Sequence, residues 1–285
     1  MSSISTVTLL VRDLSKSVAA YQTFGYRVVG SGVLQPQDLP VLHDVRLCGC
    51  AYTQLLLHES SDQRVEVIEY PDCQLLAAFE SSGWAALEIL VSDLMQVEAH
   101  VKALGLEVIG KPQALSISQD IRAMQVIGCA GELIYFTEQL APVAEWPLPI
   151  ASALFDQCFI VVLCTHDLQL TRKFYAGLFN LPMPKIVESK VLALSRVAGC
   201  AVSHRHHISA MSLGGGHWLE FDQWHHSIAS SHSELAAGIF SIGIHGPSLS
   251  EQLALGQRVV DPRSGQDCLL VKGPSGERLV CYQIE

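Results

Sequence analysis

Two glutamates in strand-like segments are the residues best suited to chemistry. Glu66 stands in Val65-Glu66-Val67 and Glu220 in Leu219-Glu220-Phe221. Successive side chains of a strand alternate between its faces, so each glutamate points away from its apolar neighbours. If that face is enclosed, loss of hydration raises the pKa of the carboxyl and suits it to general acid or base catalysis.

Histidines gather just before Glu220, at His204, His206, His207 and His217, and two more follow it at His225 and His226. Alternation places His207, Ser209 and Met211 on one face of a strand, and His206, Ile208 and Ala210 on the other. We expect His207 to stand beside Glu220, as an acid–base partner or as a second ligand of a rebuilt metal site. The alternative is a polar loop that enters a strand with histidines at its edge. His225 and His226 are expected in a loop that caps the site.

Two aromatic residues are further candidates. Tyr135, in Leu133-Ile134-Tyr135-Phe136, could orient a substrate oxygen through its hydroxyl, or be a core aromatic. Trp218 shares a strand face with Glu220 and could form an aromatic wall, although such residues are more often core.

The elements that position these residues recur four times. Each copy has an opening strand, a helix and further strand-like runs, in the order βαβββ. The helix-start residues Asp13, Asp93, Asp167 and Ser248 lie 80, 74 and 81 residues apart. Self-similarity at a fixed period indicates a repeat architecture, so the fold class is predicted as α+β with four tandem βαβββ modules.

The predicted helices span 15–23, 94–104, 168–178 and 249–255. The predicted strands include 27–34, 51–58, 64–70, 120–128, 132–138, 206–213, 217–224, 268–272 and 277–283. A shift of 154 residues carries Asp13 to Asp167, Tyr21 to Tyr175 and Glu66 to Glu220, which indicates a duplicated half. The proline-rich stretch 141–153 is predicted as a linker between domain 1–140, with modules one and two, and domain 154–285, with modules three and four.

Composition limits the classes of partner. The 285 residues are 49% hydrophobic and 16% charged, with a net charge of -10 and no run of Lys or Arg, so nucleic acid and anionic membranes are poor partners. No apolar stretch approaches the ~18 residues of a spanning helix, and no secretion signal is visible. Nine cysteines, an odd number without CxxC, predict reduced thiols in a cytoplasmic protein. The low charge and positive hydropathy allow a homodimer.

The helix starts carry a family resemblance. Asp13-Leu14-Ser15-Lys16-Ser17-Val18-Ala19-Ala20-Tyr21 and Asp167-Leu168-Gln169-Leu170-Thr171-Arg172-Lys173-Phe174-Tyr175 resemble the helix start of the vicinal oxygen chelate superfamily. This superfamily contains glyoxalases, bleomycin-resistance proteins and extradiol dioxygenases. The resemblance implies that modules pair into two half-open, mixed-sheet cups. It also implies a divalent metal held by His on opening strands and Glu on closing strands, with substrate chelating it.

The positions that the resemblance assigns to metal ligands lack histidine. Those on the opening strands, seven residues before each helix start, are Thr6, Ala86, Ile160 and Ser241, and a local gap could bring Cys158 or Gln157 to the third. Those on the closing strands are Glu66, Tyr135, Glu220 and Val280. If modules pair within each half, the N-terminal cup would hold Thr6, Glu66, Ala86 and Tyr135. The C-terminal cup would hold Ile160, Glu220, Ser241 and Val280. One carboxylate per cup cannot hold the ion, so the usual metal site is predicted to be lost.

These observations favour an enzyme acting on a small apolar or aromatic oxygen-bearing substrate by acid–base isomerisation or lyase chemistry. Glu220 would be the base and His207 the acid or orienting group. Substrate contacts are expected from Thr6, Glu66, Tyr135, Cys158, Trp218 and Ser241. The alternatives are a metal-free binding or resistance protein, and a metal-dependent ring-cleaving dioxygenase whose ligands lie a residue or two away.

Overall fold

The computed structural model describes residues 2–57, 62–115, 118–144, 147–224, 235–246 and 255–283. In module one, β1 (Ser3–Val11), α1 (Leu14–Thr23), β2 (Arg27–Val33), β3 (Ala51–Leu56) and β4 (Arg64–Glu69) follow in order, with the short 3₁₀ turns η1 (Pro36–Asp38), η2 (Pro40–Leu42) and η3 (Val45–Leu47). Module two has β5 (Gly83–Val91), α2 (Leu94–Ala103), β6 (Glu107–Leu115), β7 (Ser118–Ile127) and β8 (Leu133–Gln139).

Module three has β9 (Phe155–Thr165), α3 (Leu168–Phe179), β10 (Ile186–Ser189), α4 (Leu192–Val197), β11 (His206–Gly214) and β12 (His217–Gln223). Module four has β13 (Gly238–Gly246), β14 (Gly256–Val260), β15 (Asp267–Lys272) and β16 (Arg278–Gln283). The predicted fold class is confirmed, while α4 was not predicted. Most of the predicted helix 249–255, and both His225 and His226, lie outside the described residues.

The repeated aspartate starts each of the three long helices. Asp13 accepts a hydrogen bond from the backbone N–H of Lys16 (2.9 Å), and Asp167 from that of Leu170 (2.9 Å). Asp93 accepts two such bonds, at 2.9 and 3.0 Å. Side-chain oxygens at this position satisfy N–H groups that the helix itself cannot pair, which fixes where it begins.

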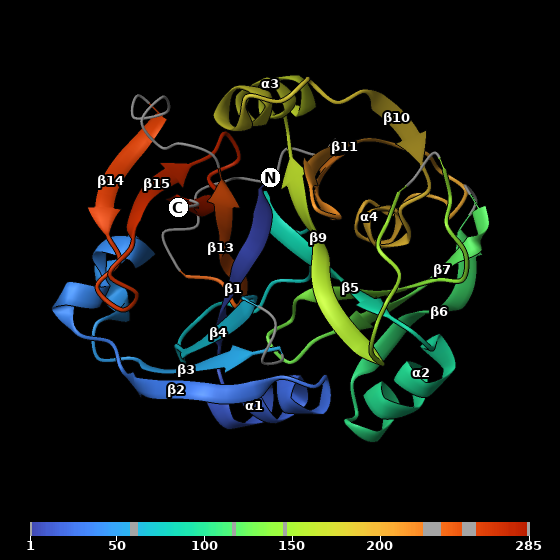
Figure 1. Ribbon diagram of the computed structural model, residues 1–285. Coiled ribbons are helices and arrows are strands. Elements are labelled where there is room, and N and C mark those ends of the chain that lie inside the picture. The colour runs from blue at the N-terminus through green and yellow to red at the C-terminus, as the bar shows by residue number, and fades with distance from the viewer. Residues whose placement is uncertain are drawn as a thin grey trace.

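The strands form two eight-stranded sheets, and each sheet combines both halves of the chain. Modules one and four form sheet 1/4, in the order β14-β15-β16-β13-β1-β4-β3-β2, and modules two and three form sheet 2/3, in the order β10-β11-β12-β9-β5-β8-β7-β6. Each sheet curls into a cup, and β1 and β9 lie beside each other at the centre (Figure 1). The predicted pairing of modules within each half is therefore wrong, because β1 pairs antiparallel with β13 and β5 with β9.

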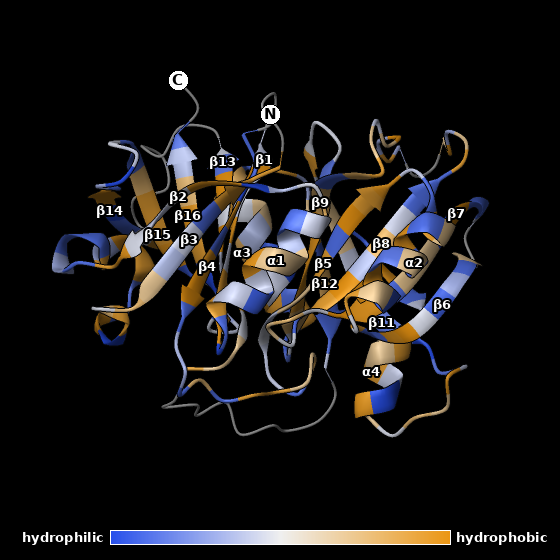
Figure 2. Cartoon of the chain, turned by 90° about the horizontal axis from the view of Figure 1, so that it is seen from below, coloured by the Kyte–Doolittle hydropathy of each residue, from blue (hydrophilic) through white to orange (hydrophobic). Residues whose placement is uncertain are grey.

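A common apolar core lies between the convex sides of the two sheets and includes residues of α1, α2 and α3. Each cup also has an apolar cluster of its own. In cup 1/4 the 3₁₀ turns contribute Leu39, Val41, Leu42 and Leu47, and in cup 2/3 helix α4 contributes Ala193 and Leu194. Figure 2 shows that the strands in the middle of both sheets are mostly hydrophobic, whereas α1 and α2 carry mixed surfaces.

Buried tyrosine–glutamate pairs join the modules of each half. The hydroxyl of Tyr21 on α1 donates to Glu132 (3.1 Å), before β8, and the hydroxyl of Tyr175 on α3 donates to Glu277 (2.8 Å), before β16. Glu132 also accepts the backbone N–H of Ala130 (2.8 Å). A Cβ at Gly128 would lie 2.3 Å from the Glu132 carboxyl carbon, so a glycine is required in this turn.

We expect Gly128→Ala to destabilise the protein by about 1–3 kcal/mol, because the new methyl group displaces the buried Glu132 carboxyl from its two donors. Gly177→Ala is the matched control, since Gly177 is an exposed residue of α3 whose added Cβ would meet nothing within 4 Å. That change should stabilise by about 0.5–1 kcal/mol through helix propensity. Urea unfolding measures both, and equal effects at the two glycines would contradict the packing argument.

Candidate active site in the second cup

Three carboxyls from different strands gather on the concave side of sheet 2/3. Glu220 and Asp222 lie on one face of β12, with Val162 and Cys164 of β9 opposite them. Glu88 of β5 has Ile160 on one side and Tyr135 of β8 on the other. The inward orientation that the repeat position predicted for Glu220 is confirmed, because its partner Val162 on β9, with Ile160 and Cys164 on the same face, belongs to the apolar cluster of this cup.

Burial and mutual repulsion govern the protonation of these groups. Burial raises the pKa of Glu88 to about 8, and the charge of Glu220 adds to the rise, while a hydrogen bond from Thr137 opposes it. Burial likewise raises the pKa values of Glu220 and Asp222; the charge of Asp222 raises the pKa of Glu220 further, and the charge of Glu88 adds to the rise in the pKa of Asp222. At neutral pH the group therefore retains protons that exposed carboxyls would have lost.

Tyr135 stands among these carboxyls and stays a proton donor. Burial raises its pKa well above the ordinary value, and the charges of Asp222, Glu220 and Glu88 raise it further. Glu88, Tyr135, Trp218 and Glu220 all keep part of their surface accessible to solvent, although they lie deep in the cup. The arrangement places an ionisable base and neutral O–H donors together among apolar walls, as proton transfer requires.

Helix α4 and the chain before β9 cover this group. Ala193 and Leu194 of α4 belong to the apolar cluster, and Leu148 and Ala151 pack against it. Figure 1 shows α4 inside the curl of the sheet. Ser195 of α4 is fully buried, and its hydroxyl is 2.9 Å from Nε2 of His206 on β11, which ties the helix to the sheet.

The predicted pair of Glu220 and His207 does not form. Ala210 is the residue of β11 opposite Glu220, so the face of Glu220 carries His206 and Ile208. His207 points to the other face, is exposed, and lies 3.6 Å from Glu188 of β10. The sequence left open which face of this strand meets Glu220, and only the β11–β12 register decides it.

The structure brings together some of the other predicted site residues. Tyr135 and Trp218 lie in cup 2/3 with Glu220, as described above. Cys158 was predicted to line a cup, and this is wrong: it is buried in the common core between the sheets. Its backbone N–H and C=O bond to the side chain of Gln63 at 2.6 and 2.7 Å, and burial raises the pKa of its thiol to about 12.

Glu88 and Asp222 were not predicted to be site residues. Glu88 lies between Leu87 and Ile89, the same apolar–acidic–apolar pattern that marked Glu66 and Glu220, so the sequence contained a signal for it. Asp222 shares a face with Glu220 by simple alternation, but only the β5–β9 pairing shows that Glu88 joins them.

Cup 1/4 collects the remaining predicted residues. Thr6, Glu66, Ser241 and Val280 all line one small cavity of about 20 Å³, although they come from modules one and four. The guanidinium of Arg263, from the loop after β14, also lines this cavity. Arg263 contacts the Glu66 carboxylate, and its Nε is 3.5 Å from Oδ1 of Asp261. Nothing in the strand pattern marked Arg263, because it lies in a loop.

This ion pair changes what the first cup can do. Glu66 is 2% exposed and also accepts a hydrogen bond from Gln54 (3.2 Å). The guanidinium of Arg263 therefore already occupies the Glu66 carboxylate, which is not free to contact a substrate proton. Beside the pair, an open, polar cavity of about 420 Å³ is lined by Thr6, Gln54, His245 and Tyr282.

The donors of neither cup fit the divalent metal that the fold implies. In cup 1/4, Thr6 and Ser241 stand at the imidazole positions and Val280 at a carboxylate position, and Arg263 already neutralises Glu66. In cup 2/3, Ala86 and Ile160 stand at the opening-strand positions. Over the described parts of the chain, no group of three or more His, Cys, Asp or Glu side chains is arranged to hold a metal ion.

Comparison with known proteins agrees with this architecture. No protein-family model matches the sequence, and no curated protein does so either. Glyoxalase I from Zea mays has a similar structure, with a TM-score of 0.67 at 12% identity, over 99% of this chain and 92% of that one. A proposed dioxygenase from Bacillus subtilis has a TM-score of 0.61 at 10% identity, over 99% and 84% of the two chains.

The chain has the vicinal oxygen chelate fold. This confirms the resemblance in the helix-start motifs as far as the fold is concerned. Of the helices that the structure describes, none has the length and apolar character needed to cross a membrane.

The raised pKa of Glu88 predicts a pH-dependent stability. Its folded pKa of about 8 lies above the unfolded value of about 4.5, so the folded state holds the proton more tightly. This contribution is fully present below the unfolded pKa and is lost as pH rises through 8. Between pH 5 and pH 9 the free energy of unfolding of the wild type should therefore fall. In Glu88→Gln this fall should be smaller by at least about 1 kcal/mol.

Unfolding by urea at pH 5, 7 and 9 measures this difference. Glu188→Gln is the control, because that carboxyl is exposed on β10, and it should follow the wild type. An identical pH dependence in Glu88→Gln and the wild type would show that Glu88 is not held in its protonated form.

Proposed function

We propose that the protein is an enzyme that transfers protons within a small oxygen-bearing substrate bound in cup 2/3, with the neighbouring carboxyls Glu220 and Asp222 together as the base. The observation that carries this proposal is the group of Glu88, Glu220 and Asp222, which share one apolar cup and have raised pKa values. Titratable groups whose environments shift their pKa values toward neutrality are suited to acid–base catalysis.

The chemistry that fits is isomerisation through an enol. For an α-hydroxy carbonyl compound, the Glu220–Asp222 pair removes a proton from the carbon beside the carbonyl, and the C–H electrons form a C=C bond. The carbonyl oxygen receives the proton of Glu88. The hydroxyl on the deprotonated carbon then returns a proton to Glu88, and the former carbonyl carbon receives the abstracted proton from the Glu220–Asp222 pair as the C=C electrons form the new C–H bond. Both carboxyls end in their starting states, and the carbonyl has moved by one carbon.

Tyr135 and Trp218 support this chemistry as binding residues. The Tyr135 hydroxyl remains protonated, so it can donate a hydrogen bond to a substrate oxygen. Trp218 lies two residues before Glu220 on the same face of β12 and offers an apolar surface to the substrate body. Apolar walls with a few convergent polar groups are typical of small-molecule sites.

Proton exchange tests the proposal without a known product. In D₂O, the wild type should catalyse deuterium incorporation beside the carbonyl of at least one member of a panel of small α-hydroxy ketones and aldehydes. Glu220→Gln should lower this rate at least about 100-fold, since it removes the base. The wild-type rate should fall as pH rises above about 8, where Glu88 loses its proton.

His207→Ala is the matched control, because His207 lies on the opposite face and should leave the exchange rate unchanged. NMR follows the loss of the proton signal. Exchange that survives in Glu220→Gln, or that is lost equally in His207→Ala, would contradict the assignment of the base.

Two other functions share this fold and are separated by direct measurement. A binding or resistance protein would retain a ligand in the cup without exchange or turnover. A ring-cleaving dioxygenase would require bound iron or manganese. Because neither cup has a fitting donor set among the residues that the structure describes, we expect substoichiometric iron, manganese, zinc and magnesium by elemental analysis of freshly purified protein. We also expect the exchange rate to be insensitive to a chelator. One tightly bound iron or manganese ion per chain would favour the dioxygenase.

A further inference from the structure

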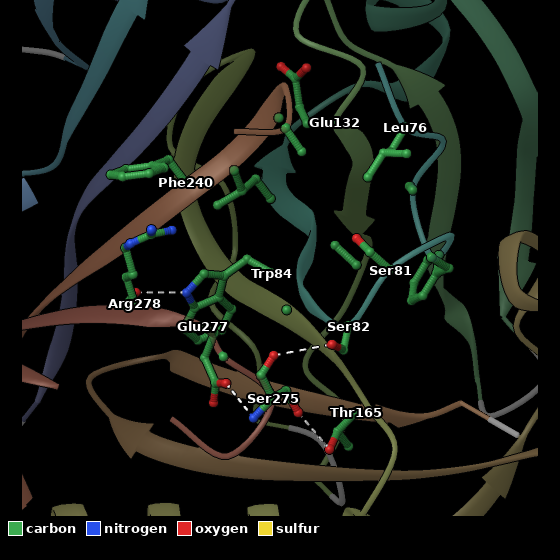
Figure 3. Close-up of a pocket in the computed structure, with 18 of the residues that line it drawn as sticks. Leu76, Ser81, Ser82, Trp84, Glu132, Thr165, Phe240, Ser275, Glu277 and Arg278 are labelled. Atoms are coloured by element: carbon green, nitrogen blue, oxygen red, sulfur yellow. Dashed lines mark hydrogen bonds between the residues drawn. The ribbon is translucent and has the colours of Figure 1, made fainter. Parts of the chain in front are cut away.

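A second large cavity lies away from the carboxyls of cup 2/3. Its volume is about 460 Å³, and it is bounded by the starts of β5, β13 and β16 and by the end of β9. The polar cavity of cup 1/4 is near the other ends of β13 and β16, at His245 and Tyr282. Figure 3 shows side chains of this second cavity, with Phe240 and Arg278 on one side, Trp84 in the middle and Ser275 with Thr165 below.

Basic side chains converge at one end of the cavity. Arg46, Lys272 and Arg278 line it, from η3, β15 and β16. Asp44 is the carboxylate among them: it binds Arg46 at 2.6 Å and Arg278 at 3.4 Å. Among the described residues, three cations therefore face one carboxylate at this end of the cavity, in a chain whose net charge is -10.

Burial and neighbouring charges act together on the basic side chains at this end. Burial lowers the pKa of Arg278; the attraction of Asp44 opposes this shift, and repulsion from Arg46 adds to it. Burial also lowers the pKa of His43, and Arg278 and Lys272 add to that shift. A bound anion would relieve this repulsion, because opposite charges stabilise one another most strongly where water is partly excluded.

The other carboxyls that line the cavity accept hydrogen bonds from groups outside the basic end. Glu277 accepts hydrogen bonds from the Tyr175 hydroxyl and from the backbone N–H of Ser275, both at 2.8 Å. Glu132 is held in the same way by Tyr21 and Ala130, and Asp167 caps α3. These groups have structural partners and do not neutralise the basic end.

Aromatic surface lies next to the cations. The guanidinium of Arg278 stacks over the ring of Phe240, with its carbon 4.3 Å from the ring centroid. The indole N–H of Trp84 donates to the backbone oxygen of Arg278 (2.9 Å), which fixes the indole beside the same arginine. Within the described residues, Arg278 makes one side-chain hydrogen bond, to Asp44, so most of its five N–H donors remain for a ligand.

We propose that this cavity binds a small organic anion: an oxyanion, carboxylate or phosphate, attached to an aromatic or branched apolar body. The oxyanion would lie against Arg278, Arg46 and Lys272, and the body against Trp84 and Phe240. Arginine presents paired N–H donors that match both carboxylate and phosphate. The site is separate from Glu220, so it would act as a second binding site on the same chain.

Binding of simple probes tests the proposal. Isothermal titration calorimetry would compare benzoate and phenyl phosphate with neutral benzamide, and with acetate and inorganic phosphate, which lack the body. We expect wild-type protein to bind benzoate or phenyl phosphate at least about tenfold more tightly than benzamide. The preferred probe distinguishes a carboxylate from a phosphate site. Affinity should fall as salt is raised.

Arg278→Gln should weaken the preferred probe at least about tenfold. Arg258→Gln is the matched control, because Arg258 is an exposed arginine of β14 that pairs with Asp267 and does not line the cavity. It should bind like the wild type. Should Arg278→Gln fail to fold, Lys272→Gln removes an exposed charge of the same cluster and should weaken binding by about two- to fivefold.

Glu220→Gln should bind the probes like the wild type, so this experiment and the exchange experiment fail independently. The proposal is overturned if no charged probe binds the wild type at up to about 10 mM. It is equally overturned if benzamide binds as well as benzoate, or if Arg278→Gln and Arg258→Gln bind alike.

Discussion

The antiparallel pairing of opening strands from different halves is the interaction on which both candidate sites depend. β1 pairs with β13 and β5 with β9, so each cup is closed only when the two halves meet. Glu88 of the first half then faces Glu220 of the second, and Glu66 of the first half meets Arg263 of the second. Gln63 reinforces this junction, since its buried amide bonds to the backbone of both β1 and β9.

A different set of contacts holds the modules of each half together. The two tyrosine–glutamate pairs connect the helix of an odd-numbered module with the turn before the last strand of the next. Their carboxyls are packed so closely against Gly128 and Gly273 that a Cβ at either position would overlap them. Sheets therefore join the halves, while helices and turns join modules within a half. This division makes one continuous core between the two sheets.

The two cups carry a glutamate at the same strand position, but the charges around that glutamate differ. In cup 1/4 the closing-strand carboxylate Glu66 is neutralised by Arg263, and the cavity beside it is polar and open. In cup 2/3 the closing-strand carboxylate Glu220 has two further carboxyls as neighbours and an apolar cover that includes α4. Glu66 is paired with a guanidinium, whereas burial raises the pKa values of the three carboxyls in cup 2/3. We therefore assign acid–base chemistry to the second cup.

The sequence by itself determined the local units. The period of the repeat located four modules, Asp13, Asp93 and Asp167 marked the helix starts, and the repeat positions of Glu66 and Glu220 predicted that both face inward. It also showed that the metal-ligand positions lack histidine. Only the tertiary structure decided which modules share a sheet. The opening strands have the same apolar pattern, so β1 could pair with β5 or with β13 at similar local cost, and long-range packing selects the partner. For the same reason the sequence could not place Glu88 beside Glu220, Arg263 beside Glu66, or His207 on the outer face of β11.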